Sequence, residues 1–211
     1  ILLVVFIFTF NYEQFVEIPK SPSQLSGETH DRVNAVILSI VMAVLVIMFY
    51  FKGKFNFDNK AGTLRLLAKI WIFLNAVLVI SAFAKNSEYI ISLGITYKRL
   101  GVYAFLVLAF IGLILTFIKI KDEKTNAFLF NHMSWYFYGT VLAASFINWG
   151  NVATVYNIRN EKGNFDFHKS LNYNDEILLK VYPNEFEKTT KPTEIAKEQN
   201  KTFLSKIIYY Q

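Results

Sequence analysis

The chain has 211 residues, of which 54% are hydrophobic and 18% are charged. Soluble domains average about 45 to 50% apolar and about 25% charged residues, so both values indicate a membrane protein. The sequence contains no cysteine, which excludes thiolate metal sites, thiol nucleophiles and disulfides within it. The net charge is +6, and the basic residues are concentrated in the loops between apolar segments. They do not form the basic, aromatic-lined face of a single-strand binder, so we expect no nucleic-acid partner.

The N-terminal segment, residues 1–10, reads ILLVVFIFTF. It is too short to cross about 30 Å of hydrocarbon as a helix, which takes about 20 residues. We therefore interpret it as the second half of an incomplete span. Residues 11–33 carry four acidic and two basic side chains, which predicts an acidic loop that includes His30.

Three complete spans are predicted at residues 34–51, 66–84 and 100–118. The first and third contain no charged residue, and the second contains only Lys69, near one end, where its long stem reaches the lipid headgroups. These three segments form the centre of the predicted bundle.

The uncharged run at residues 125–158 predicts a further span at 128–150, with Trp135 and Trp149 as interfacial aromatics. No proline occurs between Pro22 and Pro183, so we expect unbroken helices in this core.

The chain becomes polar after residue 158. Asn174 is placed to cap a short helix, a turn is expected at Pro183, and Thr193 is placed to cap a second, amphipathic helix. The prediction is an all-α, polytopic transmembrane helical bundle over residues 1–158, with about five spans of which the first is incomplete. A small helical extramembrane tail follows at 159–211.

Charge sets the expected orientation. Residues 52–69 carry five basic side chains and one acidic one, so loops 52–65 and 119–124 are placed in the cytoplasm. Residues 11–33, 85–99 and the tail then lie on the outer, periplasmic side of a bacterial inner membrane. The segment 85–99 is itself positive, and an alternative is that YIISLGITYKRLG forms a short interfacial helix and turn with its cations against the bundle.

No motif for common catalysis is present: the sequence lacks HExxH, GxSxG, GxGxxG, P-loop and EF-hand patterns. No acidic residue falls within a predicted span, which argues against an ion-coupled transporter. We therefore expect no enzyme activity, no catalytic residue, no metal and no cofactor.

Five polar residues remain as candidate contacts to lipids or partners: Lys98, Arg99, Asn75, His132 and His30. Asn75 is expected either to bond across helices or to form a polar site, and His132 to cap a helix or to join that site. Lys98 and Arg99 are expected to anchor at the interface, to hold a lipid phosphate or to pair with a nearby carboxylate.

Several ordered segments resemble a known family. They are the region around His30, the box formed by Gly94, Thr96, Lys98, Arg99 and Tyr103, and the run NWGNVATVYNI that ends at residue 158. Over about residues 20 to 180 the chain resembles the bacterial multi-pass membrane family called domain of unknown function 4173. The resemblance implies an inner-membrane bundle that forms the C-terminal part of a larger protein, and it implies no activity.

The sparse polar groups favour a non-catalytic accessory or assembly subunit of a larger envelope membrane complex. Its expected partners are membrane lipids and other membrane protein subunits. One alternative is a permease or lipid-handling protein with a pocket near Asn75, His132 and the Lys98/Arg99 pair. Another is a membrane sensor that signals through the basic loop at 52–65.

Overall fold

The computed structural model describes residues 4–5, 7–9, 12, 22–52 and 58–189, without the side chains of 22–33, 59 and 187–189. All regular structure in these residues is helical, and no strand occurs among them, so the expectation of an all-α chain is confirmed there. The chain divides into two compact units, Ile1–Ser92 with Lys98–Phe146 and Leu93–Tyr97 with Ile147–Gln211.

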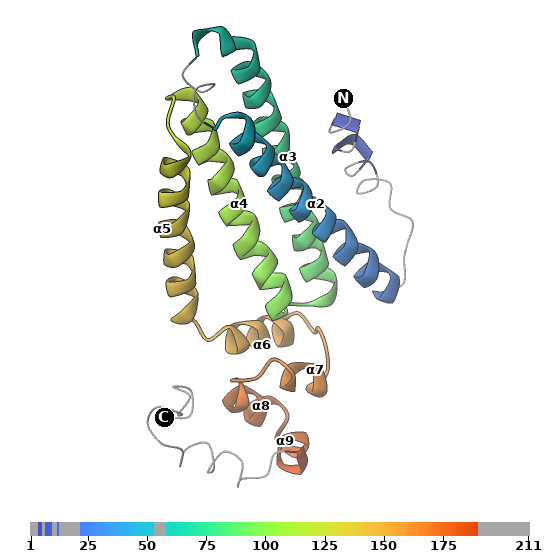
Figure 1. The fold of residues 1–211 in the computed structure, drawn as a ribbon. Helices are drawn as coiled ribbons and strands as arrows, with labels where there is room; N and C mark the ends of the chain where they lie inside the picture. The colour runs from blue at the N-terminus through green and yellow to red at the C-terminus, as the bar shows by residue number, and fades with distance from the viewer. Residues whose placement is uncertain (1–3, 6, 10–11, 13–21, 53–57, 190–211) are drawn as a thin grey trace. The chain divides into compact units, whose positions relative to one another are not determined.

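The first unit contains four long helices that run alternately up and down (Figure 1). They are α2 (Pro22–Tyr50), α3 (Gly62–Leu93), α4 (Tyr97–Lys121) and α5 (Asn126–Ser145). A 3-10 turn, η2 (Asn59–Ala61), leads into α3, and the Asp58 side chain caps it by accepting a hydrogen bond of 2.8 Å from the Lys60 backbone N–H.

Apolar side chains of α2, α3 and α4 form the core of this unit. They include Ile40, Ile47, Ile72, Leu78, Leu106 and Leu113, each at most 4% exposed. Buried hydroxyl groups in the same helices bond to their own backbone, as Thr116 Oγ1 does to the carbonyl of Gly112 at 2.7 Å. The centre of the bundle is therefore built mainly by apolar side chains at helical spacing.

Two of the described helices, α3 and α4, are long and apolar enough to cross a membrane. The apolar part of α2, Asn34–Tyr50, is shorter, and α5 is not among the helices that qualify. Half of residues 1–10, namely 1–3, 6 and 10, lie outside the described residues. A helical bundle with two candidate spans is thus supported, and the expected count of five is not confirmed.

The expectation of unbroken helices is wrong at residues 146–148. Helix α5 ends at Ser145, the Phe146 N–H bonds to the carbonyls of Ala143 and Ala144, and α6 (Trp149–Arg159) begins after a bend. The Asn148 side chain starts α6 by accepting a 3.0 Å bond from the Asn151 N–H. The predicted span 128–150 is thus interrupted after Ser145 without any proline, and an asparagine cap starts the next helix.

Two predicted loops are largely helical. Residues 22–33, expected as an acidic loop, form the start of α2, which opens at Pro22 because proline is tolerated in the first turn. Helix α3 continues beyond residue 84 to Leu93, so only Gly94–Thr96 separate it from α4. The positive segment 85–99 is therefore two helix ends and a tight turn.

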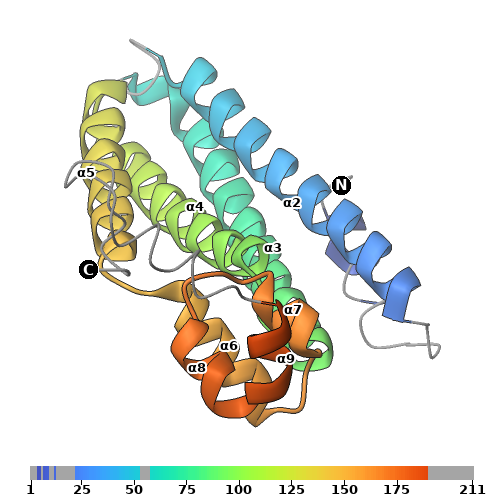
Figure 2. The same ribbon diagram turned by 90° about the horizontal axis from the view of Figure 1, so that it is seen from below.

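The second unit contains short helices that follow one another in a cluster (Figures 1 and 2). These are α6, α7 (Phe165–Lys169), α8 (Asp175–Val181) and α9 (Pro183–Thr189), and α8 contacts each of the other three. Asn174 occupies the N-cap position of α8, as expected, but its side chain makes no capping hydrogen bond there. Apart from Leu93–Tyr97, this unit consists of the chain from Ile147 onward. The amphipathic helix expected from Thr193 lies outside the described residues.

Candidate functional site

Arg99 is held against α3 at the closed end of the α3–α4 hairpin. Its guanidinium carbon lies 4.0 Å from the ring centroid of Tyr89, which is buried. Its carbonyl oxygen accepts a 3.1 Å hydrogen bond from Asn86 Nδ2, also buried. A cation over an aromatic face is attracted by the ring quadrupole, so the side chain of Arg99 has a fixed place. This agrees with the alternative in which the cation lies against the bundle.

A pair of hydroxyl groups, from Ser87 and Tyr103, lies about one helical turn from Arg99, farther from the α3–α4 turn. Ser87 Oγ donates to the carbonyl of Phe83 at 2.9 Å and lies 2.7 Å from Tyr103 Oη. Because serine has one O–H, the shared hydrogen bond is donated by Tyr103. The rings of Phe83 and Tyr103 lie 4.5 Å apart. The two helices are thus joined by a polar pair whose donors are satisfied.

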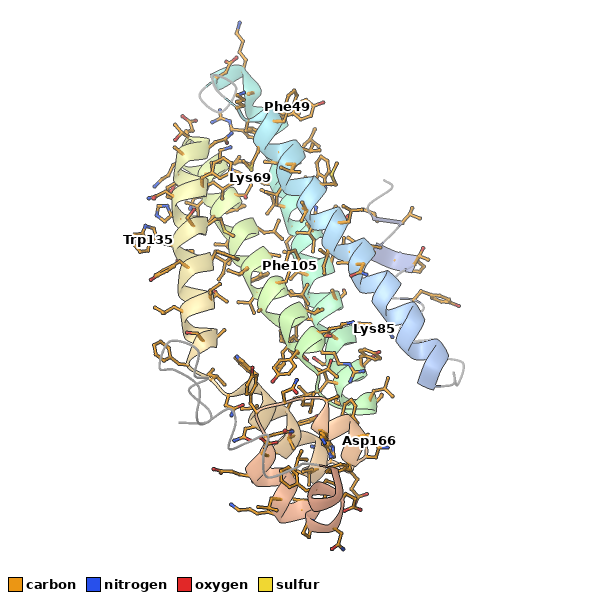
Figure 3. All side chains as sticks on the ribbon, turned by 60° about the horizontal axis from the view of Figure 1, so that its bottom comes forward. Phe49, Lys69, Lys85, Phe105, Trp135 and Asp166 are labelled. Atoms are coloured by element: carbon orange, nitrogen blue, oxygen red, sulfur yellow. The ribbon has the colours of Figure 1, made fainter. Side chains whose placement is uncertain are left out.

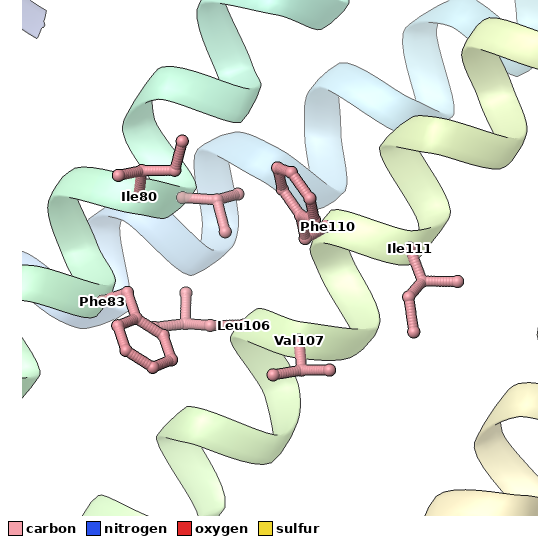
Figure 4. A pocket seen from close by; sticks show the side chains of 7 residues that line it. Ile80, Phe83, Leu106, Val107, Phe110 and Ile111 are labelled. Carbon is pink, nitrogen blue, oxygen red and sulfur yellow. The ribbon is translucent and has the colours of Figure 1, made fainter.

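Beyond this pair the hairpin forms an apolar groove of about 270 Å³ (Figure 4). Its lining is entirely apolar and consists of Val79, Ile80, Phe83, Leu106, Val107, Phe110 and Ile111. On α4, residues 99, 103, 106, 107 and 110 follow helical spacing along one face. We call this continuous surface, from Arg99 past Ser87 and Tyr103 to the groove, the α3–α4 stripe.

The other cations of the segment 85–99 have different surroundings. Lys85 is 6% exposed and forms an ion pair of 3.2 Å with Glu88, so these two charges offset each other. Lys98 is exposed and points about 100° around α4 from Arg99. The two adjacent cations therefore lie on different faces of α4.

Asn75 and His132 do not join Arg99 in one pocket. Asn75 is fully buried in the middle of α3, whereas Arg99 is in the first turn of α4, so roughly 25 Å of helix separates them. Asn75 Nδ2 bonds to the carbonyl of Trp71 at 2.9 Å, and its Oδ1 has no partner among the described residues. The expected bond from Asn75 to another helix is therefore not found there.

His132 lies in the second turn of α5, so its expected role as a cap is wrong. Its Nδ1 lies 2.8 Å from the carbonyl of Phe128, which makes Nδ1 the protonated nitrogen. The ring packs on Phe128 with centroids 4.2 Å apart. His30 belongs to α2, and its side chain lies outside the described residues.

Two contacts at the opposite end of the bundle escaped the sequence analysis. Lys119 is fully buried, and its Nζ lies 3.4 Å from the carbonyl of Phe51, at the end of α2. Arg65 forms an ion pair with Glu123. The start of α3 and the α4–α5 turn therefore share one end of the bundle, as the charge pattern predicts. Residue 119 was expected in the loop 119–124, since only the register of α2 against α4 places its side chain inside.

In the second unit, Asn157 clamps the turn that joins α3 to α4. Its Oδ1 accepts from the Ile95 N–H at 2.6 Å, and its Nδ2 donates to the Ile95 carbonyl at 2.9 Å. Gly94 has a φ of 84°, and a Cβ there would lie 2.5 Å from Asn157 Oδ1. The glycine box of the sequence is thus, at this point, a structural clamp.

A second buried network surrounds His168, which is 1% exposed. Its Nε2 lies 2.8 Å from the Lys162 carbonyl and its Nδ1 lies 3.3 Å from Tyr182 Oη. Asn174 Nδ2 donates to Thr154 Oγ1 and to the His168 carbonyl. Among the described residues, no group of three or more His, Asp and Glu side chains is placed to hold a metal ion.

Comparison with known families identifies the chain. Residues 1–178 match the domain of unknown function DUF4153. The chain belongs to this family. The resemblance to domain of unknown function 4173 is therefore wrong as to the family, because apolar runs between short basic loops recur in many membrane proteins and do not discriminate among them. No curated protein and no solved structure matches the chain significantly.

Proposed function

We propose that this protein is a multi-pass protein of the bacterial inner membrane that acts as a non-catalytic accessory or assembly subunit of a larger envelope complex. The observation that supports this proposal is the surface of α5. This helix contacts its own bundle along a narrow line and presents most of its circumference outward.

Four consecutive aromatic residues of α5 are exposed. Trp135, Tyr136, Phe137 and Tyr138 are 68%, 47%, 59% and 60% exposed, and Trp135 extends away from the neighbouring helices (Figure 3). Consecutive residues of a helix point about 100° apart, so these four cover most directions around the axis. Leu129 is the one buried residue among those described in α5.

A protein partner suits this surface better than lipid alone. Helices α3 and α4 are apolar enough to face hydrocarbon, whereas α5 is not among the qualifying helices and exposes Asn131 as well as its aromatic residues. An amide facing lipid without a hydrogen-bond partner is unfavourable. Tryptophan and tyrosine, in contrast, dominate the centres of protein interfaces. We infer that α5 packs against a helix of another subunit.

The test is affinity purification of the tagged protein from native membranes in mild detergent, followed by mass spectrometry. A stoichiometric partner is expected, and the Trp135→Ala/Tyr138→Ala double variant should retain it at least about tenfold less well, because interface aromatics are worth about 2 kcal/mol or more each. The matched control is Leu66→Ala/Leu67→Ala, which trims two exposed side chains of α3. Equal retention by both double variants would reject α5 as the docking surface.

The proposed topology has three crossings, α3, α4 and α5, between Lys60 and Ser170. Since the chain has no cysteine, the single variants Lys60→Cys and Ser170→Cys report their sides by thiol labelling in intact cells. Both positions are exposed. We expect cytoplasmic placement of residue 60 and periplasmic placement of residue 170. Labelling of both from the same side would leave an even number of crossings and remove α5 as a span.

A further inference from the structure

We propose that the α3–α4 stripe is a binding site for one membrane phospholipid, with an acyl chain in the groove and the phosphodiester at Arg99. This inference rests on the membrane location in the proposed function, but not on the accessory role. The proposed site holds one phospholipid in a defined position, in contrast to the lipids that surround the rest of the protein without a specific site.

The groove suits a hydrocarbon chain. Its floor is Leu106, which is fully buried, and its rims are Phe83 and Phe110, which are 44% and 38% exposed. Figure 4 shows the two rings extending from α3 and α4 on either side. No polar atom contributes to the lining, so a chain in the groove loses no hydrogen bond and gains contact with both helices. From Arg99 to Phe110 the stripe runs roughly 16 Å along α4.

The closed end of the hairpin suits a phosphate. The guanidinium of Arg99 stacks on Tyr89 through its face, and its N–H donors project from its edges. Arginine binds phosphate oxygens through such parallel donors, and stacking reduces the entropy lost on binding. Glu88, which precedes Tyr89 in α3, is paired with Lys85, so its charge opposes an anion less than an unpaired carboxylate would.

The order of groups along the stripe matches the order along a phospholipid. The cation lies at the hairpin end, where a headgroup region would be, and the carbon-lined groove lies deeper between the two candidate spans. The Ser87 and Tyr103 hydroxyl groups lie between the cation and the groove. Ser87 donates to the Phe83 carbonyl and Tyr103 donates to Ser87, so neither hydroxyl group presents an unsatisfied donor to the acyl chain. An apolar helix of a partner protein could also occupy the groove, but only a ligand with an anionic group would use the Arg99 cation beside it.

The first experiment maps the acyl chain. The protein is reconstituted in phosphatidylglycerol and phosphatidylethanolamine vesicles with a trace of phosphatidylglycerol that carries a diazirine on one acyl chain, then irradiated and analysed by mass spectrometry. Crosslinks should concentrate at Ile80, Phe83, Val107 and Phe110. The Val107→Phe variant, which fills the groove, should lower them at least fivefold, and Leu67→Phe, at an exposed position on α3 outside the groove, should leave them unchanged.

The second experiment tests the phosphate. Phospholipid that remains bound after detergent purification is measured as phosphorus per protein. Arg99→Gln should lower it about fivefold, and the matched control Lys98→Gln, which removes the adjacent exposed cation, should not. If Arg99→Gln fails to fold, Val107→Phe gives the same readout, with the same loss expected.

Crosslinks spread evenly over the exposed faces of α3 and α4 would overturn the proposal, since they would mean ordinary surrounding lipid only. Equal effects of Arg99→Gln and Lys98→Gln would overturn it as well, and so would a copurified protein crosslinked in the groove. Membrane insertion and the α5-dependent partner are measured in the same preparations. A failed lipid site is therefore distinct from a failed membrane or subunit assignment.

Discussion

In the middle of the α2–α5 unit, buried hydroxyl and amide groups bond to the backbone of their own helix, whereas at the closed end of the α3–α4 hairpin and in the α6–α9 unit they bond from one element to another. Ser81 and Asn75 illustrate the first pattern, with bonds of 3.0 and 2.9 Å to carbonyls four residues earlier. Asn157 and Asn174 illustrate the second. The first unit needs apolar side chains at helical spacing, and the second needs particular residues at particular positions.

Helix length explains this difference. The helices of the second unit have 11, 5, 7 and 7 residues. Isolated helices shorter than about 12 residues are marginal in water because nucleation is unfavourable. Such helices persist when side chains of other elements bond to their ends and turns. Substitutions of polar residues and of close-packed glycines should therefore be costly in this unit and nearly neutral in the middle of the bundle, where buried polar groups bond within their own helix.

The largest difference is expected between two glycines. A Cβ at Gly150 would overlap the backbone carbonyl oxygen of Asn172, which cannot move like a side chain, while a Cβ at Gly139 meets nothing within 4 Å. Gly150→Ala should destabilise the second unit by about 3 kcal/mol or more. Gly139→Ala should be neutral or stabilise α5 by up to about 1 kcal/mol. Hydrogen exchange measured by mass spectrometry over residues 147–186 and over α5 separates the two effects.

Similar losses from both glycine variants would contradict the comparison, since they would mean that α5 is packed as tightly as α6. A silent Gly150→Ala variant would show that the α6 contact with the Leu171–Asn172 backbone is not required.

The next largest difference in stability is expected between Asn157, whose side chain bonds to the α3–α4 turn, and Ser81, whose side chain bonds within its own helix. Asn157→Ala removes two hydrogen bonds and leaves the N–H and carbonyl of Ile95 without their partner. We expect a loss of about 2 to 4 kcal/mol, because an orphaned, partly buried polar group costs about 1 to 3 kcal/mol. Ser81→Ala removes a bond of Ser81 to its own helix and should change stability by less than about 0.5 kcal/mol. Thermal unfolding in detergent measures both.

If Ser81→Ala proves as costly as Asn157→Ala, the bundle also depends on specific polar bonds, and the contrast between the units fails. The conservative variant Asn157→Asp sharpens the result, because it keeps the acceptor for the Ile95 N–H but loses the donor to the Ile95 carbonyl.

The helices of the bundle were predictable from sequence because hydropathy marks the long apolar segments that they contain. The apolar runs at 66–84 and 100–118 fall within observed helices, and the run at 34–51 does so up to Tyr50, although α2 and α3 extend beyond the predicted runs at their other ends. These extensions were missed because charged residues mark where apolar surroundings end, and a helix continues past that point. The break before Trp149 was missed because its cause is one asparagine cap.

The candidate site was predictable in part. Arg99 was identified by its charge at the start of a span, but its stacking on Tyr89 and the hydroxyl pair of Ser87 and Tyr103 depend on the register between α3 and α4. That register follows from the length of the turn at Gly94–Thr96, which the sequence analysis took to be a much longer connection. Asn157 was likewise hidden, since its partner Ile95 is distant in the chain.

The smallest expected effect tests whether the hydrogen bonds around His168 in the second unit stabilise it independently or cooperatively. Tyr182→Phe removes the hydroxyl group 3.3 Å from His168 Nδ1, while the 2.8 Å contact of His168 Nε2 with the Lys162 carbonyl remains. Because only the 3.3 Å bond is lost and the His168 ring keeps its bond to Lys162, we expect the free energy of unfolding to fall by about 0.5 to 1 kcal/mol. The same change in the bundle, Tyr138→Phe, alters an exposed hydroxyl group and should have no measurable effect on stability. Hydrogen exchange of the Phe165–Lys169 backbone is the measurement. A loss above about 2 kcal/mol would mean that the His168 contacts act cooperatively, and the second unit would then depend on single side chains even more strongly than its short helices imply.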